Sequence, residues 1–419
     1  MDPNQYSQCL FTYRECGVGV PASVVVIGNG AGGLGAAAAA RAADPSLQVT
    51  SHPSVSSLDL DRRTVEVEGH GAVKWDRLII TEGSSTGPPA GVPTDVDGLY
   101  AYDSLPASGE WEQLLADVKV AVVLDATPAG LETVAALAQR GIETHLVDPH
   151  GSILAGAVDA EISGQVEESW GEMGVKAHFN TQVEEFLAGE ARKVRGVRTS
   201  QGELPAELVV VCSRPAVGND VASAAGLEVS ATGGIVVDER MATSAAGVWA
   251  AGDCIDLPAG TARFPLQDSS SHSYAQGRVA GTNAAGGSRT YQPAYVPWAL
   301  SAGRWLLGGV AYGETQATAL GVDYVLGKAT GISRARYYPD VKKVTVKLLA
   351  EPGSLRLIGA QMVGGEGIKE RAGFLGMAVR MGVTLTDLAY MENVYSPPIG
   401  ALNEPIAVAA QNGLAGLGS

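Results

Sequence analysis

The chain is poor in cysteine, in basic charge and in long apolar runs, and each shortage narrows what it can be. Its 419 residues include four cysteines, with no CxxC pair and no metal-ligand cluster, which is typical of the reducing cytoplasm. The net charge of −16 argues against nucleic acid or an anionic membrane as a partner. No apolar run reaches the roughly 18 residues of a membrane span, and the first residues lack a secretory pattern. We therefore expect a cytoplasmic protein without a membrane span or a metal site.

The residues that are abundant indicate a globular nucleotide-binding protein. Hydrophobic residues make up 46% of the chain and charged residues 18%, a composition that is rich in core material. Many of the 54 glycines stand in short loops between apolar strands, as nucleotide-binding α/β folds require. The length predicts two or three domains.

The first motif is a strand, a glycine turn and a helix. Ala22–Ile27 is a continuous apolar run, as expected of a buried strand, and an alanine-rich helix is predicted from Leu34 to Ala43. Between them Gly28, Gly30 and Gly33 form GxGxxG. In this context the three glycines permit a tight turn, a close approach of a pyrophosphate and close helix–strand packing, so we predict a dinucleotide site.

The acid that normally follows this motif by about 20 residues is missing. The corresponding stretch, residues 48–53, reads Gln-Val-Thr-Ser-His-Pro. The ribose anchor of this site is therefore either absent or supplied from elsewhere in the chain.

A second unit of the same kind spans residues 118–150 and has the opposite defect. Its turn, residues 125–130, keeps only Gly130, because Asp125 and Thr127 replace the first two glycines. Asp125 would oppose a pyrophosphate, whereas Asp148 ends the next strand where it could bind a ribose hydroxyl and favour NAD over NADP. Two interpretations remain open, a weakened NAD site and a Rossmann-like domain that has lost its nucleotide.

The most specific stretch lies further on. A short strand, Val248–Ala251, leads into Gly252 and Asp253, an arrangement in which the acid can bind a ribityl hydroxyl. From about residue 291 the pattern changes to an antiparallel pair, 341–349 and 355–363, followed by helices at 368–381 and 403–410. This predicts a separate α+β domain.

These stretches resemble the pyridine nucleotide–disulfide oxidoreductases. Residues 243–254 resemble the second flavin fingerprint of that superfamily, Ser213-Arg-Pro215 the turn that closes its NAD domain, and residues 276–281 the helix after the flavin aspartate. Residues 358–365 and Tyr395-Ser-Pro-Pro398 resemble its dimerisation domain. The Tyr-x-Pro-Pro form is similar to the coenzyme A-disulfide reductase and NADH oxidase branch.

The resemblance implies an α/β fold with two Rossmann-like FAD/NAD(P)-binding domains, β-meanders and a C-terminal α+β dimerisation domain. It divides the chain into an N-terminal arm (1–21), an FAD domain (22–105 and 240–290), an NAD-like domain (106–239) and a dimerisation domain (291–419). FAD is the implied cofactor, NAD(H) is possible but in doubt, and a homodimer is the implied assembly. The implied cofactor-binding residues are Gly28, Gly30, Gly33, Gly83, Gly130, Asp148, Gly252, Asp253 and Gln276.

Two further residues are candidates for catalysis. In the resembling branch the stretch after the second strand carries a redox cysteine, which is missing here after Thr50. The segment Tyr6-Ser-Gln-Cys9, followed by Tyr13, resembles that stretch but stands ahead of the glycine turn. Either the arm folds back into the vacant place or the sequence around residues 1–51 is incomplete or rearranged. Cys9 is then the candidate redox cysteine, and Tyr395 the residue that reaches the partner's active site.

The predicted function is an FAD-dependent oxidoreductase that passes electrons between NAD(H) and an acceptor. The acceptor is a thiol or disulfide, dioxygen or a partner redox subunit. The alternative is a non-catalytic or electron-relaying flavoprotein subunit of a larger redox complex, with a degraded NAD site.

Overall fold

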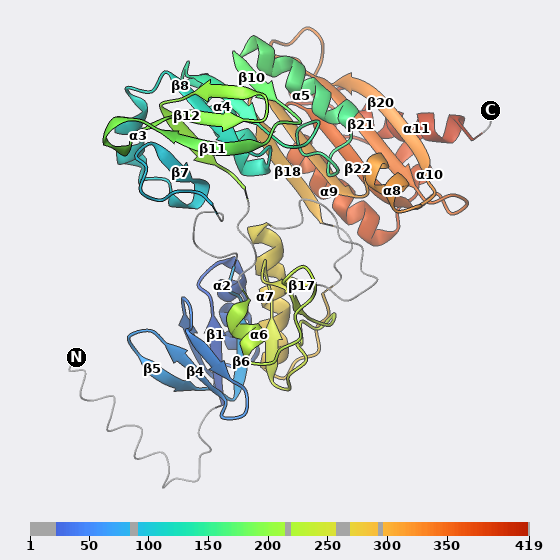
Figure 1. The fold of residues 1–419 in the computed structure, drawn as a ribbon. Helices are drawn as coiled ribbons and strands as arrows, with labels where there is room; N and C mark the ends of the chain where they lie inside the picture. The colour runs from blue at the N-terminus through green and yellow to red at the C-terminus, as the bar shows by residue number, and fades with distance from the viewer. Residues whose placement is uncertain (1–21, 84–90, 214–218, 257–268, 292–295, 418–419) are drawn as a thin grey trace. The chain divides into compact units, whose positions relative to one another are not determined.

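The computed structural model describes residues 22–83, 91–213, 219–256, 269–291 and 296–417. These residues fall into two compact units (Figure 1). The first unit takes in residues 22–83, 219–256 and 269–291, and the second takes in residues 91–213 and 296–417. The expected arm, residues 1–21 with Cys9, lies outside the described residues.

The first unit is built on a four-stranded parallel sheet. Its strands, in spatial order, are β16 (Val248–Ala250), β6 (Arg77–Ile80), β1 (Ser23–Ile27) and β2 (Gln48–His52). An antiparallel meander of β3 (Ser57–Asp59), β4 (Thr64–Val67) and β5 (Gly71–Lys74) precedes β6. Three short elements complete the unit: α6 (Asp220–Ala224), β15 (Ile235–Val236) and β17 (Ile255–Asp256).

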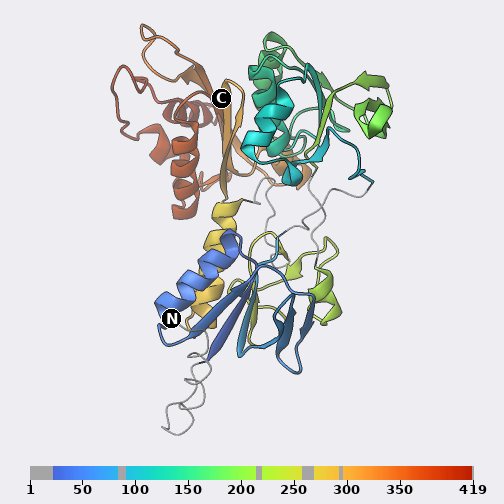
Figure 2. The ribbon, with the colours of Figure 1, turned by 90° about the vertical axis from the view of Figure 1, so that its left-hand side faces the viewer.

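Two helices of this unit, α2 (Ala31–Ala43) and α7 (Ser270–Ala284), lie side by side (Figure 2). Glycines set their spacing. A Cβ at Gly277 would lie 2.0 Å from the carbonyl oxygen of Gly32, and one at Gly281 would lie 2.1 Å from that of Ala36. Larger side chains at these two positions would therefore push the helices apart.

The second unit contains a five-stranded parallel sheet. Its order is β10 (Val175–His178), β9 (Glu143–Val147), β8 (Val120–Leu124), β14 (Leu208–Val211) and β7 (Leu99–Ala101). The helices are α3 (Ser108–Leu115), α4 (Pro128–Gln139) and α5 (Ala160–Glu172), with short 3-10 turns at Tyr102–Ser104 and Glu190–Arg192. An antiparallel meander of β11 (Val183–Ala188), β12 (Val194–Thr199) and β13 (Gly202–Pro205) follows β10.

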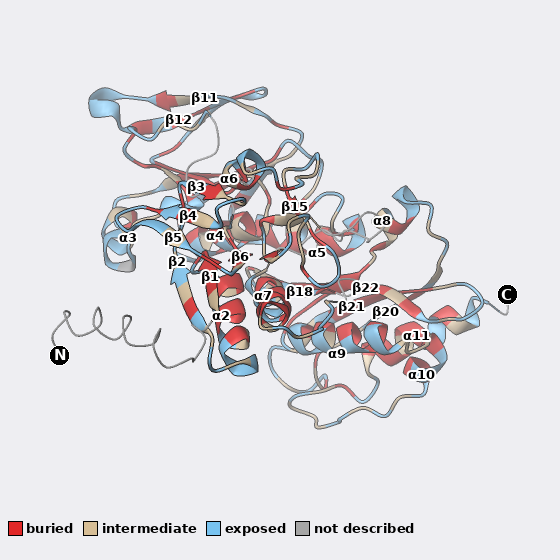
Figure 3. Ribbon diagram, turned by 90° about the horizontal axis from the view of Figure 1, so that it is seen from below, coloured by how far each residue is buried: buried red, intermediate tan, exposed pale blue. Residues whose placement is uncertain are grey.

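The rest of the second unit is an antiparallel sheet with helices. Its strands run β18 (Pro297–Ala302), β19 (Trp305–Ala311), β22 (Leu357–Gly364), β21 (Lys343–Ala350) and β20 (Val325–Ile332). The helices are α8 (Glu314–Ala319), α9 (Ile368–Met381), α10 (Leu385–Ala389) and α11 (Pro405–Ala415). Strand β22 is buried along almost all of its length (Figure 3), which explains why its sequence is nearly continuously apolar.

Most of the predicted elements are present. The antiparallel pair is β21 and β22, and the helix expected at 368–381 is α9 with the same bounds. Strand β7 pairs with β14, so residues 99–101 belong to the second sheet, although residues 22–105 were expected in the first domain. Residues 219–239 likewise fall in the first unit, where β15 pairs with β17, although residues 106–239 were expected in the NAD-like domain. Both differences arise from strand pairing between distant segments, which the sequence pattern does not encode.

A buried ion cluster joins the parallel and antiparallel sheets of the second unit. Lys347 on β21 is 3% exposed, and its Nζ lies 2.7 Å from an oxygen of Asp159 and 2.6 Å from one of Glu314. Asp159 stands at the start of α5 and also accepts the backbone N–H of Thr315 (2.9 Å). Burial alone would raise the pKa of Asp159, but the hydrogen bonds from Lys347 and Thr315 hold it below its usual value.

Removing Lys347 should therefore be costly. We predict that Lys347→Met leaves Asp159 buried and unpaired and lowers the free energy of unfolding by about 3–5 kcal/mol. Its cross-strand neighbour Lys328 pairs with exposed Glu161, so Lys328→Met should cost no more than about 1 kcal/mol. Urea denaturation of both variants compares the two losses, and equal losses would contradict the role given to the cluster.

Candidate functional site

The glycine turn of the first unit tolerates no side chain at two of its three positions. Gly28 has φ +98°, and a Cβ there would lie 2.4 Å from the carbonyl oxygen of Thr81. A Cβ at Gly33 would lie 1.9 Å from the carbonyl oxygen of Gly28. Around Gly30, by contrast, no atom lies within 4 Å of the added Cβ. The turn is thus closed at its base and open in front of α2.

The N-terminus of α2 is available to an anion. Gly30 is its N-cap, no side chain caps it, and its first turn contains no acidic residue. The first N–H groups of a helix lack intrahelical acceptors and carry the positive end of the helix dipole. This arrangement fits a pyrophosphate in the open space at Gly30.

The expected ribose acid is replaced by proline. Ile27 pairs with His52 in the first sheet, and Leu124 pairs with Val147 in the second. The residue after each paired position is Pro53 in the first unit and Asp148 in the second. Pro53 has no side-chain hydrogen-bonding group, so the ribose anchor is absent from its usual place.

The second flavin motif lies at the carboxyl edge of the same sheet. Gly252 has φ +92° and donates its backbone N–H to Oε1 of Gln276 (2.8 Å). Asp253 is exposed, and its Oδ1 accepts the hydroxyl of Ser273 (2.9 Å) at the start of α7. Gly83, after β6, is exposed at this edge as well. The structure therefore brings the predicted residues of the first unit to one edge of one sheet.

Two residues at this edge were not predicted from the sequence. The Thr81 hydroxyl donates to the carbonyl oxygen of Ile27 (2.6 Å) and ties β6 to the turn. Glu82 follows it, and burial raises the pKa of its carboxyl group. The only sequence signal for either residue was its place directly after a buried strand.

The turn of the second unit has the same close contact between a glycine and a carbonyl oxygen, but the N-terminus of its helix, α4, is capped. A Cβ at Gly130 would lie 2.0 Å from the carbonyl oxygen of Asp125, as at Gly33. Asp125 itself has φ +70°. The Thr127 hydroxyl caps α4 by accepting the N–H of Gly130 (3.2 Å), and it donates to the carbonyl oxygen of Cys212 (2.9 Å). Pro128, the first residue of α4, has no N–H.

The carboxylate of Asp148 is engaged by the protein. It is buried and accepts the backbone N–H groups of Ala126 (2.7 Å) and His150 (2.7 Å). Nδ1 of His150 also lies 2.9 Å from it. Asp148 thus lies beside the turn, and backbone N–H groups of the protein occupy much of its hydrogen-bonding capacity.

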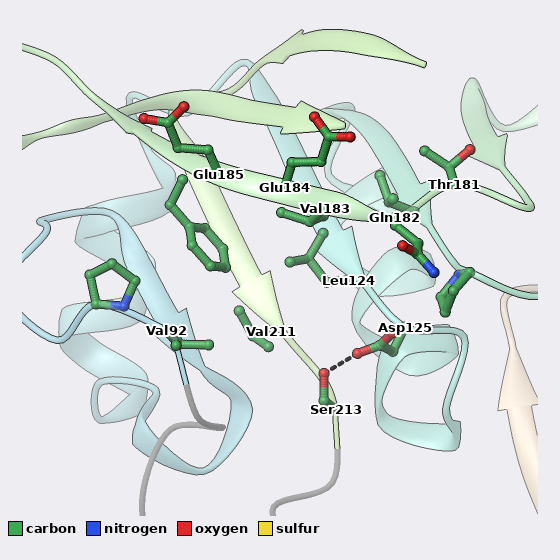
Figure 4. A pocket seen from close by; sticks show the side chains of 15 residues that line it. Val92, Leu124, Asp125, Thr181, Gln182, Val183, Glu184, Glu185, Val211 and Ser213 are labelled. Carbon is green, nitrogen blue, oxygen red and sulfur yellow. Dashed lines mark hydrogen bonds between the residues drawn. The ribbon is translucent and has the colours of Figure 1, made fainter. Parts of the chain in front are cut away.

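A pocket of about 690 Å³ opens at the carboxyl edge of the second sheet (Figure 4). Asp125 and Ser213 face each other on one side of it, and Glu184 and Glu185 extend from β11 on the other. None of the described residues that line it is basic. They are Gly91, Val92, Pro93, Leu124, Asp125, Val147, Pro149, Thr181, Gln182, Val183, Glu184, Glu185, Phe186, Val211 and Ser213.

Two cysteines of the described residues are buried, and the candidate Tyr395 is exposed. Burial raises the pKa of Cys212 and of Cys254 to about 12, so both are thiols at neutral pH. Tyr395 is exposed in the segment between α10 and α11. Cys9, and Arg214 and Pro215 of the predicted closing turn, lie outside the described residues. Within the described part of the chain we find neither a cluster of metal ligands nor a helix long and apolar enough to cross a membrane.

Comparison with known proteins agrees with this geometry. The chain is 26% identical over 345 residues to an NADH oxidase of Methanocaldococcus jannaschii, covering 82% of this chain and 76% of that protein. It is 26% identical over 377 residues to an NAD(P)H coenzyme A polysulfide/persulfide reductase of Pyrococcus horikoshii, covering 86% and 81%. The solved structure of an NAD-dependent persulfide reductase from A. fulgidus superposes with a TM-score of 0.86 at 25% identity, covering 95% of this chain and 84% of that one.

Two family models match this chain, one after the other along the sequence. The model described as pyridine nucleotide-disulphide oxidoreductase matches residues 43–281, more than half of the chain. The model of the dimerisation domain of the same family matches residues 303–405. The chain belongs to the pyridine nucleotide-disulphide oxidoreductase family.

Proposed function

We propose that this chain is an FAD-dependent oxidoreductase that passes electrons between NAD(H) and a thiol or disulfide, dioxygen or a partner redox subunit. The observation that carries the proposal is the uncapped N-terminus of α2 behind the open turn at Gly30. That site and Asp253 belong to one sheet edge, where a dinucleotide is bound in such folds. When bound, FAD supplies the hydride and electron transfer, and the protein supplies position and electrostatics.

The residues of the chain have separable roles in this proposal. The N–H groups of α2 hold the pyrophosphate, Asp253 accepts a ribityl hydroxyl, and Gln276 fixes the backbone of Gly252 through its hydrogen bond. Cys9 is the candidate thiol that exchanges with a disulfide acceptor. Tyr395 is the candidate contribution from the partner subunit. Gly83 borders the flavin at the end of β6, and Gly130 and Asp148 border the pyridine nucleotide.

One observation favours the alternative of an electron-relaying flavoprotein. Thr127 and Pro128 remove N–H donors from the N-terminus of α4, and Asp125 adds a negative charge beside it. A pyridine nucleotide fits this turn less well than FAD fits the turn at Gly28. Electrons would then reach the flavin from a redox partner protein instead of from NADH.

The glycine turn gives the first test. Gly30→Ala fits the structure without a clash and should fold normally. Its methyl group would occupy the pyrophosphate space, so the affinity for FAD should fall at least about tenfold and the flavin content should fall with it. Gly33→Ala would strike the carbonyl oxygen of Gly28 and should destabilise the unit itself. Flavin absorbance per protein and the unfolding temperature separate the effects. Full flavin content in Gly30→Ala would refute the placement.

The electron donor and Cys9 are tested together under anaerobic conditions. NADH should bleach the flavin absorbance of the purified protein, and Cys9→Ser should abolish turnover of coenzyme A disulfide while leaving that bleaching intact. A flavin reduced by dithionite but not by NADH would favour the relaying subunit. Unchanged disulfide turnover in Cys9→Ser would remove the thiol chemistry.

The dimerisation domain predicts a homodimer through an exposed apolar patch. Phe374, Met377 and Met381 lie on one face of α9 and are 46%, 58% and 71% exposed, which is unusual for a free surface. Stable dimers bury about 800 Å² per partner. Met377→Asp should therefore yield a monomer by light scattering, whereas Leu320→Asp, at the end of α8, should not. A monomeric wild type would contradict the homodimer.

A further inference from the structure

A hydrogen bond spans the crevice where the second unit would receive a dinucleotide. From β8 the chain continues to β9 and β10 on one side of the sheet, whereas β14 pairs with β8 on the other side. The topological switch point of this sheet therefore lies between β8 and β14. Ligands of doubly wound sheets bind in the crevice outside this point. Asp125 follows β8 and Ser213 follows β14, and the Ser213 hydroxyl donates to the Asp125 carboxylate across it (Figure 4).

Asp125 holds this position at a conformational cost. Its φ of +70° lies in the left-handed region, which the equivalent Gly28 occupies at φ +98°. Aspartate tolerates this region better than most residues that have a Cβ, but glycine occupies it without a steric cost. Since glycine would remove the strain, the side chain at position 125 is the feature that needs an explanation.

The charge of Asp125 is poorly tolerated where it lies. Burial, and then the neighbouring charge of Asp148, raises the pKa of its carboxyl group, although the hydroxyl of Ser213 and the nearby His150 lower it. The other titratable groups around it are Cys212 at the end of β14, and Glu184 and Glu185 across the pocket. The described residues lining the pocket provide no cation to offset a phosphate.

We propose that Asp125 and Ser213 form a latch over the crevice, which excludes the phosphates of a pyridine dinucleotide while Asp125 is ionised and admits them once Asp125 is protonated. The proton is taken up from solvent, and the carboxyl O–H then donates to a phosphate oxygen instead of repelling it. The inference rests on the proposed function, in which NADH is the electron donor. It assigns to Asp125 the control of NADH affinity by pH.

The latch predicts a specific pH dependence of NADH binding. At pH values above the pKa of Asp125, NADH binding requires the uptake of a proton. The dissociation constant of NADH should therefore fall up to about tenfold for each unit by which the pH is lowered. Binding should also take up close to one proton, which is measured by calorimetry in buffers of different ionisation enthalpy. Asp125→Asn, which is permanently uncharged, should bind NADH at least about tenfold tighter than the wild type at about pH 8 and without this slope.

Matched variants separate the latch from general electrostatics. Glu184→Gln removes a carboxylate of the same pocket outside the latch, and His150→Gln removes the neighbouring titratable ring, so both should keep the slope. Ser213→Ala deletes the donor that stabilises the ionised form, and it should shift the slope to higher pH. A slope that persists in Asp125→Asn, or a wild type that binds NADH tightly and independently of pH, would overturn the proposal.

Flavin measurements on the same samples keep this test apart from that of the proposed function. Asp125 belongs to the second unit, so its variants should retain the flavin content and dithionite reduction of the wild type. If NADH binds with the predicted slope but never bleaches the flavin, the latch stands and the NADH-dependent activity fails. If NADH bleaches the flavin equally in the wild type and Asp125→Asn at every pH, the activity stands and the latch fails.

Discussion

Both nucleotide-binding halves depend on the same close contact between a helix glycine and the carbonyl oxygen of the first turn residue. A Cβ at Gly33 would lie 1.9 Å from that oxygen, and one at Gly130 would lie 2.0 Å from it. No other residue permits the helix to cross the strand at this distance. The third glycine is therefore present in both halves, whereas the second half has Asp125 and Thr127 at the first two positions.

The residue at the second turn position differs between the two halves and changes the anion site without changing the fold. In the first half Gly30 leaves the N-terminus of α2 open, and in the second half Thr127 fills the same position and caps α4. The peptide dipoles of the two helices are alike, but the donors that a phosphate would use differ. The two turns share the glycine contact but present different N–H donors in front of their helices.

Buried polar contacts join the parallel and antiparallel parts of the second unit. Lys347, Asp159 and Glu314 form a buried ion cluster that joins α5 to the antiparallel sheet. Gln361 on β22 adds a hydrogen bond from the backbone N–H of Asp159 (2.8 Å). A shared hydrophobic core, which includes Leu300, Leu307 and Val363, also joins the two sheets, and residues 91–213 and 296–417 form one compact unit.

The sequence by itself determined the features that depend on local pattern. The apolar run and the glycine spacing predicted the strand, turn and helix around Gly28, and the helix expected at 368–381 has the bounds of α9. The family followed from motifs such as Gly252-Asp253, because such a motif is a run of neighbouring residues at one strand end. Each of these motifs consists of residues that are adjacent in the sequence.

Only the tertiary structure decided what depends on segments far apart in the chain. Strand β7 joins the second sheet through β14, and helix α5 and strands β18–β20 were not predicted, since their burial comes from partners elsewhere in the sequence. The alignment of Pro53 with Asp148 required the strand registers, and the bond between Asp125 and Ser213 joins residues 88 positions apart. Residue types can suggest that such groups matter, but packing alone determines which of them meet.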